Sequence, residues 1–373
     1  MKSVLKRAFF GLFEVLAPSP RVRLVDEVRA RLVADPLTIV DVGAVFGPDK
    51  RWRQLGERTC RFITFEPDKR SQTPIDERGP FAMRALPTAI GREPGTRMLY
   101  LTKGEFASSL YPPNQAVLGV FGTWPWHESA GTDQVTVDTL DHALDSCPGW
   151  TPDFIKTDIE GADLDALLGG ERALSSALGI QVEAAFVERN VGAPLFAEID
   201  QHLRAHGFML FQLIREHWLR RNGVRGVASR PQLIWADVVY FRDAAGFAAR
   251  LAAAADREAM LVKFVALLLA YGHFDTAADI VAAALADGVC DESLGAALRA
   301  SIRQSTAAPG FVPRAALATA LAAAVRLAAL PFGARVREQA RQLYARQAAP
   351  LFHHLYRESM RAGLDRSCVS DLP

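Results

Sequence analysis

Short runs of β-branched and aromatic residues alternate with helical stretches from about residue 36 to residue 242. Such alternation is typical of βαβ units, in which parallel strands form one sheet and helices cover it. Strands are predicted at 38–42, 61–65, 81–89, 97–102, 134–138, 153–158, 180–187, 208–213 and 234–241. Helices are predicted at 49–57, 162–169 and 194–206. The pattern predicts an α/β domain over residues 36–243.

The rest of the chain, residues 244–373, is rich in alanine, has helical periodicity and contains no strand pattern. It predicts an all-helical accessory domain. The stretch LLLAYGHFDTAADIVAAALADG resembles one tetratricopeptide-type helical hairpin, but no second copy follows at a spacing of about 34 residues. Two interpretations stay open: a helical cap on the α/β domain, or a surface for a protein partner or a second copy of the chain.

The first 35 residues form a separate amphipathic segment in this interpretation. Its apolar residues share one face of a 3.6-residue period; they are Val4, Leu5, Ala8, Phe9, Leu12, Val15 and Leu16. Glu14 interrupts the apolar stretch and no small-residue cleavage site follows, which argues against a signal peptide. Such a helix can dock on its own domain, or make peripheral membrane contact through residues 1–17.

Charge and cysteine usage narrow the class of protein further. The 43 Lys+Arg and 42 Asp+Glu residues give a formal charge of +1, so nucleic acid is not an expected partner. The four cysteines are scattered with no CxxC motif, and no apolar run reaches the roughly 18 residues of a membrane span. We therefore expect a cytoplasmic protein, with the inner membrane as a place of peripheral contact.

A glycine-containing turn follows the first predicted strand. Asp41, Gly43 and Gly47 form the pattern D-x-G-x-x-x-G, and Pro48 suits the first turn of a helix. Glycines at such a place let backbone N–H groups approach a ligand. The next strand ends in FITFEPD, so Glu66 is expected beside this turn, where a carboxylate can accept two hydrogen bonds from a ribose diol.

Five stretches carry a family resemblance: TIVDVGAVFG, FITFEPD, VTVDTLD, DFIKTDIEGADLDALLGG and QVEAAFVE. In this order they resemble the FkbM family of S-adenosylmethionine-dependent methyltransferases over residues 38–242. The resemblance implies a Rossmann-like class I methyltransferase sheet, mostly parallel with the last strand antiparallel. It also implies O-methylation of a hydroxyl on a sugar, a glycan or a polyketide-like molecule, as in polysaccharide biosynthesis.

The same resemblance implies a set of cofactor contacts. For the methionine end of the cofactor it implies Asp41, Gly43, Ala44 and Gly47. For the ribose it implies Glu66 and Pro67, and for the adenine Ala89 and Ile90. Ser109 and Asp158 are the remaining implied cofactor contacts. One departure is Val45, which stands where the family usually has asparagine. Val45 supports one alternative, a non-catalytic scaffold derived from a methyltransferase. A nicotinamide-dependent oxidoreductase is a second alternative, although G-x-G-x-x-G is missing.

Acidic residues follow the strand at 153–158. Asp158 is predicted to contact the donor or the acceptor, and Glu160 is predicted to be the general base of methyl transfer. Glu183 and Glu188 are expected to point to the same edge, where Glu183 is a predicted contact of the acceptor. Asp158, Glu160 and Glu183 could hold Mg²⁺, but carboxylates at strand ends are common without metal, so magnesium is not favoured and no metal ligand is assigned.

The long connection between the strands at 97–102 and 134–138 is a candidate lid over the acceptor. Trp124 and Trp126 can present flat faces to a sugar ring, with His127 as a polar contact or an alternative base. The tryptophans can also be ordinary core residues. His202 and His206 lie four residues apart on a predicted helix. Because no HExxH motif and no third ligand accompany them, we interpret them as surface histidines.

Overall fold

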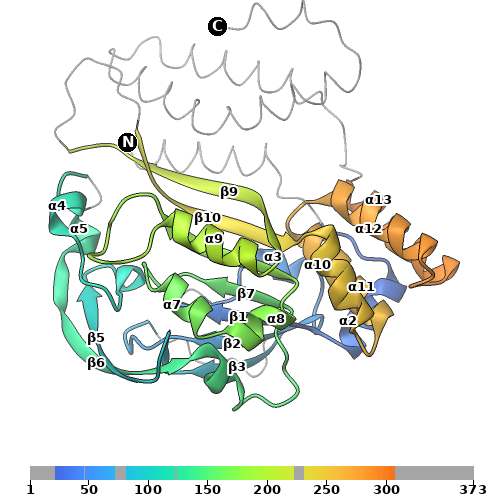
Figure 1. Cartoon of the computed structure of the whole chain (residues 1–373), viewed down its shortest axis with the longest axis horizontal. Coiled ribbons are helices and arrows are strands. Elements are labelled where there is room, and N and C mark those ends of the chain that lie inside the picture. The colour runs from blue at the N-terminus through green and yellow to red at the C-terminus, as the bar shows by residue number, and fades with distance from the viewer. Residues whose placement is uncertain (1–21, 46, 72–80, 122–123, 222–230, 307–373) are drawn as a thin grey trace, which may run out of the picture. The chain divides into compact units, whose positions relative to one another are not determined.

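Seven strands form the main sheet, in the order β3-β2-β1-β7-β8-β10-β9 (Figure 1). The computed structural model describes residues 22–45, 47–71, 81–121, 124–221 and 231–306. The strands of this sheet are β1 (Leu37–Val42), β2 (Cys60–Phe65), β3 (Ala82–Leu86), β7 (Phe154–Thr157), β8 (Gly179–Ala185), β9 (Phe208–Trp218) and β10 (Gln232–Arg242). β1, β2, β3, β7 and β8 pair in parallel, and β10 is antiparallel to both β8 and β9. The predicted Rossmann-like sheet with an antiparallel last strand is confirmed.

The central strands are buried on both faces. Every residue of β1 and of β8 is buried, which is typical of parallel strands with helices on either side. On one face, a hydrophobic cluster joins the sheet to α2 (Asp26–Ala34), α3 (Lys50–Arg53), α10 (Ala244–Ala252), α11 (Arg257–Ala270), α12 (Phe274–Ala286) and α13 (Glu292–Thr306). On the other face, a second cluster joins it to α6 (Leu140–Leu144), α7 (Asp163–Leu168), α8 (Glu171–Ser176) and α9 (Phe196–Ala205).

A second, three-stranded sheet has the order β4-β6-β5. Its strands are β4 (Ala89–Gly91), β5 (Gly95–Thr102) and β6 (Ser129–Thr139). The single strand predicted at 81–89 is therefore divided between the two sheets. Pro87 lies at the division, where its missing N–H removes a donor from the ladder. The connection from β5 to β6 contains the short helices η1 (Glu105–Ala107), α4 (Gln115–Leu118) and α5 (Trp124–His127).

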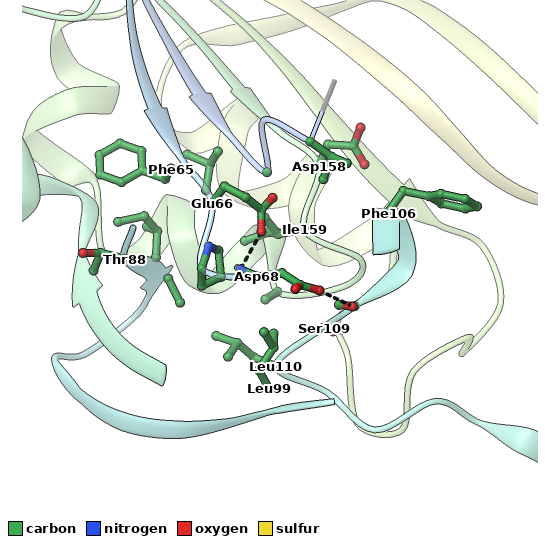
Figure 2. A pocket seen from close by; sticks show the side chains of 18 of the residues that line it. Phe65, Glu66, Asp68, Thr88, Leu99, Phe106, Ser109, Leu110, Asp158 and Ile159 are labelled. Atoms are coloured by element: carbon green, nitrogen blue, oxygen red, sulfur yellow. Dashed lines mark hydrogen bonds between the residues drawn. The ribbon is translucent and has the colours of Figure 1, made fainter. Parts of the chain in front are cut away.

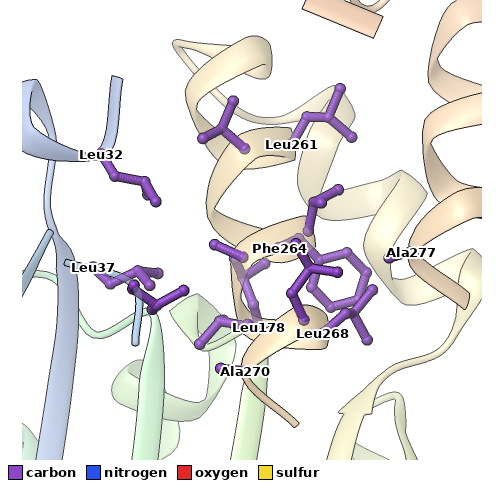
Figure 3. Packing of buried hydrophobic residues seen from close by; sticks show 14 of the residues in the cluster. Leu32, Leu37, Leu178, Leu261, Phe264, Leu268, Ala270 and Ala277 are labelled. Atoms are coloured by element: carbon purple, nitrogen blue, oxygen red, sulfur yellow. The ribbon is translucent and has the colours of Figure 1, made fainter. Parts of the chain in front are cut away.

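Helix α11 lies in the core shared by the sheet and the C-terminal helices (Figure 3). Its residues from Leu261 to Ala270 are all buried, as expected of a helix with protein on every side. The ammonium group of Lys263 lies 2.9 Å from Asp35 Oδ2 and 3.2 Å from Asp153 Oδ2. These contacts tie α11 to the chain segments that precede β1 and β7.

Residues 244–306 belong to the same compact unit as the main sheet. The domain boundaries at residues 35 and 243 stay predictions. The predicted amphipathic face of residues 1–17 and the whole of residues 307–373 lie outside the described residues. No helix in the described ranges is long and apolar enough to cross a membrane.

Candidate active site

The carboxyl ends of β1, β2 and β7 are tied together by backbone hydrogen bonds. The N–H of Gly43 donates to the carbonyl of Phe65 at 2.9 Å, and the N–H of Asp158 donates to the carbonyl of Val42 at 2.9 Å. Gly43 has φ +88°, and a Cβ atom there would lie 2.1 Å from the carbonyl oxygen of Asp158. Glycine is therefore required where β1 meets the turn after β7.

A pocket opens at these strand ends and encloses about 500 Å³, counting the part open to solvent (Figure 2). Seven of the predicted cofactor residues line it: Gly43, Glu66, Pro67, Ala89, Ile90, Ser109 and Asp158. Val45 lines it as well, whereas Asp41, Ala44 and Gly47 are not among its lining residues.

Glu66 directly follows β2 and faces the pocket (Figure 2). Its Oε1 accepts a hydrogen bond of 2.7 Å from the N–H of Asp68. Burial raises the pKa of Glu66 to about 7, although the hydrogen bond from Asp68 favours the ionised form. A half-buried carboxylate in this place can accept hydrogen bonds from a ligand diol, as the sequence predicted.

Asp68 fixes the loop after β5 to the end of β2. The guanidinium of Arg70 lies 2.6 Å from Asp68 Oδ2, and the hydroxyl of Ser108 donates to the same oxygen at 3.2 Å. The ionised form of Asp68 is favoured by Arg70, and its pKa is lowered although burial opposes this. Sequence reasoning missed this contact, because Asp68 and Ser108 are 40 residues apart.

A lysine lies between an aspartate near the end of β1 and the aspartate that follows β7. The ammonium of Lys156 is 3.2 Å from Asp41 Oδ1 and 3.3 Å from Asp158 Oδ2. Burial raises the pKa of Asp41, while Lys156 acts in the opposite direction. The side chain of Asp41 is 8% exposed and that of Asp158 is 38% exposed. A ligand in the pocket can therefore contact Asp158, which lines the pocket, and not Asp41.

Arg189 joins Glu160 and Glu183 in a buried cluster. Its guanidinium lies 2.9 Å from Glu160 Oε2 and 2.7 Å from Glu183 Oε2. Burial raises the pKa of both carboxyls, and Arg189 offsets part of that rise. Glu160 is thus paired with a cation. It is also not among the residues that line the pocket at the ends of β1, β2 and β7.

The backbone of Glu160 is in the left-handed region, with φ +55°. A non-glycine residue held there costs roughly 1–3 kcal/mol and persists only where its surroundings enforce it. The hydroxyl of Ser109 donates to the carbonyl of Glu160 at 2.8 Å, and the N–H of Gly161 donates to Asp163 at 3.1 Å. The turn after β7 is thus held from both sides.

The predicted acidic cluster is present, with Arg189 as its cation. One oxygen from each of Asp158, Glu160 and Glu183 lies within 4.8 Å of the others. Glu188, expected at the same edge, instead accepts hydrogen bonds from Asn114 Nδ2 at 3.2 Å and from the N–H of Gly192 at 2.8 Å.

The family of this domain can be assigned from its sequence. Residues 41–210 match the family described as Methyltransferase FkbM domain, and this range holds the last two residues of β1 together with Glu66, Asp158 and Arg189. These residues belong to the FkbM methyltransferase domain family. The resemblance found in the sequence is confirmed.

Two solved structures of methyltransferases share low similarity with this chain. Precorrin-6y C5,15-methyltransferase from Geobacter metallireducens GS-15 is 12% identical, with a TM-score of 0.26 over 59% of this chain and 95% of that one. Magnesium protoporphyrin IX methyltransferase (ChlM) from Synechocystis PCC 6803, solved with bound SAM, is 16% identical, with a TM-score of 0.24 over 58% and 77%. No curated protein matches the chain significantly.

Aromatic residues of the β5–β6 connection stand beside the pocket of the FkbM domain. Phe106 lines the pocket, and its ring lies 6.2 Å from that of Trp126. The two are 42% and 58% exposed. His127 is buried against Trp218, with ring centroids 5.4 Å apart, and burial lowers its pKa to about 4. The side chain of Trp124 is not among those that the structure describes.

Proposed function

We propose that the chain is an S-adenosylmethionine-dependent O-methyltransferase that acts on a hydroxyl of a sugar, a glycan or a glycan-like metabolite. The observation that carries the proposal is Glu66 beside the glycine turn, in a pocket lined by seven of the residues predicted to hold the donor. Glu66 would bind the ribose hydroxyls, and Ala89 and Ile90 would border the adenine. The backbone at Gly43 would approach the methionine end.

The acceptor side of the proposal rests on exposed aromatic rings. The rings of Phe106 and Trp126 are tilted relative to each other. Phe106 lines the pocket, and both side chains are exposed although they are large and apolar. Flat apolar faces with polar edges nearby suit the face of a sugar ring. We place the acceptor between these rings and Asp158.

Bound S-adenosylmethionine would supply an electrophilic methyl carbon. The chain must then bring the acceptor oxygen in line with that carbon at roughly 3 Å, and such alignment can lower a barrier by about 7–11 kcal/mol. A positioned base adds typically 10²–10⁴-fold. Asp158 is better placed than Glu160 to receive the hydroxyl proton, because Asp158 lines the pocket whereas Glu160 pairs with Arg189.

Glu160 and Glu183 are assigned a positioning role in this proposal. Through Arg189 they hold the turn after β7, and with it Asp158, at the strand end. Lys156 anchors the Asp158 carboxylate from the other side. The acceptor hydroxyl would therefore meet a fixed carboxylate.

The test has two stages. Calorimetry with S-adenosylhomocysteine should show binding that Glu66→Ala weakens, whereas NAD should not bind. The protein is then incubated with isotope-labelled donor and fractionated cell glycans, and the label is located. Tight NAD binding without a response to S-adenosylhomocysteine would favour an oxidoreductase; donor binding without transfer to any fraction would favour a scaffold.

A further inference from the structure

Two histidines of α9 and one glutamate of α8 converge at the junction of these helices. The ring centroids of His202 and His206 are 4.4 Å apart. His206 Nε2 lies 2.6 Å from Glu171 Oε2, and His202 Nε2 lies 3.8 Å from Glu171 Oε1. One ligand atom from each of the three side chains lies within 4.8 Å of the other two.

The ring of His206 is oriented as a metal ligand would be. Its Nδ1 lies 2.8 Å from the backbone carbonyl of His202, and a carbonyl oxygen can only accept a hydrogen bond. Nδ1 therefore carries a hydrogen, and the 2.6 Å contact of Nε2 with Glu171 Oε2 requires a second hydrogen on Nε2. A metal ion bound by Nε2 would take the place of that hydrogen. Histidines that bind metals are usually held by such a bond from the other ring nitrogen to a carbonyl or carboxylate.

His202 supplies a second, independent observation. Its Nε2 is shielded from solvent and has no hydrogen-bond partner among the described residues. The nearest acidic oxygen, Glu171 Oε1, is 3.8 Å away, which is too far for a hydrogen bond. Buried polar atoms are normally satisfied, and a cation bound between this nitrogen, His206 Nε2 and the carboxylate would satisfy it.

The backbone that carries the three side chains is held by Arg242. Its guanidinium donates to the carbonyls of Leu174 and Ala177 at the end of α8, and to the carbonyl of His206 at the end of α9. The two helices are thus fixed to each other by contacts independent of the cluster. The Glu171 side chain is 53% exposed, so its carboxylate can move to admit an ion.

We propose that Glu171, His202 and His206 bind a divalent transition-metal ion that prefers imidazole ligands, such as Zn²⁺, with water completing its coordination. Two imidazoles and a carboxylate suit zinc, nickel or copper better than magnesium, and zinc takes such ligands at about 2.0–2.2 Å. None of the three residues lines the pocket of the proposed methyl transfer. The ion would therefore cross-link α8 and α9 and stabilise the fold.

The experiment is a calorimetric titration of the full chain with Zn²⁺ in a non-chelating buffer. We expect one zinc per chain at this site, lost in His202→Ala and weakened at least 10-fold in Glu171→Gln. Zinc at about 100 times its dissociation constant should also raise the melting temperature by several degrees in the unmodified chain but not in the variants. His142→Ala is the matched control, because His142 is an exposed histidine that contacts one carboxylate, Asp138, at 2.7 Å.

Equal zinc binding in the unmodified chain and in both variants would overturn the proposal. So would a loss in His142→Ala as large as that in Glu171→Gln. Circular dichroism checks that each variant is folded. If His202→Ala fails this check, Glu171→Gln decides the matter, because its exposed side chain can be changed without disturbing the core.

Discussion

Glu66 is a carboxylate whose protonation should control donor binding at physiological pH. Its pKa is raised from 4.5 to about 7, mainly by burial. The ionised form accepts ligand hydroxyls better than the acid, so binding should be strong above pH 7 and should weaken as the pH falls through 7. For a single proton the affinity for S-adenosylhomocysteine should drop about 10-fold from pH 8 to pH 6. Calorimetry across that range measures it.

Glu66→Gln is the control for this pH effect. The amide keeps the shape of the side chain but has no proton to gain. We expect weaker binding by about 1–3 kcal/mol at pH 8, because hydrogen bonds to a charged acceptor are lost, and a flat pH profile. Parallel pH profiles in the two proteins would show that another group titrates, and that Glu66 does not hold the ribose.

Arg189 is the second residue with a large expected effect. Its replacement by methionine leaves Glu160 and Glu183 buried without their cation. Removing one partner of a buried ion pair typically costs about 3–5 kcal/mol. Urea unfolding should show a loss of that size in Arg189→Met.

The double variant Glu183→Gln/Arg189→Met tests the cause of that loss. Because Glu183→Gln removes one of the two uncompensated charges, the double variant should be more stable than Arg189→Met alone. If the stability losses of Glu183→Gln and Arg189→Met simply add in the double variant, Arg189 contributes through its packing and not through its charge. Its guanidinium carbon lies 5.8 Å from the ring centroid of Trp235.

At the scale of elements, the turn between β1 and α3 depends on two glycines with different surroundings. Both have positive φ, +88° at Gly43 and +68° at Gly47. A Cβ at Gly43 would lie 2.1 Å from the Asp158 carbonyl oxygen, whereas at Gly47 no atom lies within 4 Å. Gly47→Ala should therefore cost about 1–2 kcal/mol from backbone conformation alone. Gly43→Ala should cost about 1–3 kcal/mol more, from overpacking.

Urea unfolding and S-adenosylhomocysteine binding check this pair of variants together. Gly43→Ala must push β1 away from the turn that carries Asp158, so it should weaken donor binding as well as stability. Equal losses of stability in the two variants would mean that the contact between β1 and β7 relaxes easily and does not position the site.

The sequence predicted the strands better than the helices. β1, β2 and β7 are short apolar runs buried on both faces, and their positions agree with prediction within a residue or two. The helix predicted at 49–57 is reduced to α3, and the predicted start at Pro194 falls two residues before α9. Helix ends depend on capping contacts, and local composition records these poorly.

The site was predicted where its parts follow strand ends in order. Gly43, Glu66 and Asp158 could be placed because parallel strands bring their carboxyl ends to one edge. Arg189 and Glu171 could not be placed from the sequence, because folding brings their partners near. Arg189 pairs with Glu160, which lies in the turn after β7. Glu171 contacts His206, which is 35 residues away along the chain. No local pattern marks such pairs.

At the scale of the whole molecule, the main sheet and the helices after β10 share one hydrophobic core. Tyr271, at the end of α11, stacks on Phe154 of β7 with ring centroids 5.3 Å apart, and its hydroxyl donates to Gln181 of β8 at 2.8 Å. Gln181 pairs in register with Lys156, the lysine that holds Asp158. The C-terminal helices thus contact β7, the strand that Asp158 follows, and the neighbouring strand β8.

This shared core predicts that the sheet and α11 unfold together. Amide hydrogen exchange measured by mass spectrometry should give β1, β7 and α11 the same free energy of opening, because separating α11 exposes apolar area on both sides. Leu268→Ala, which truncates a fully buried side chain of α11, should lower that free energy by about 2–5 kcal/mol in all three elements. A loss confined to α11, with β1 and β7 unchanged, would instead mean that the helices after residue 243 fold as a separate domain.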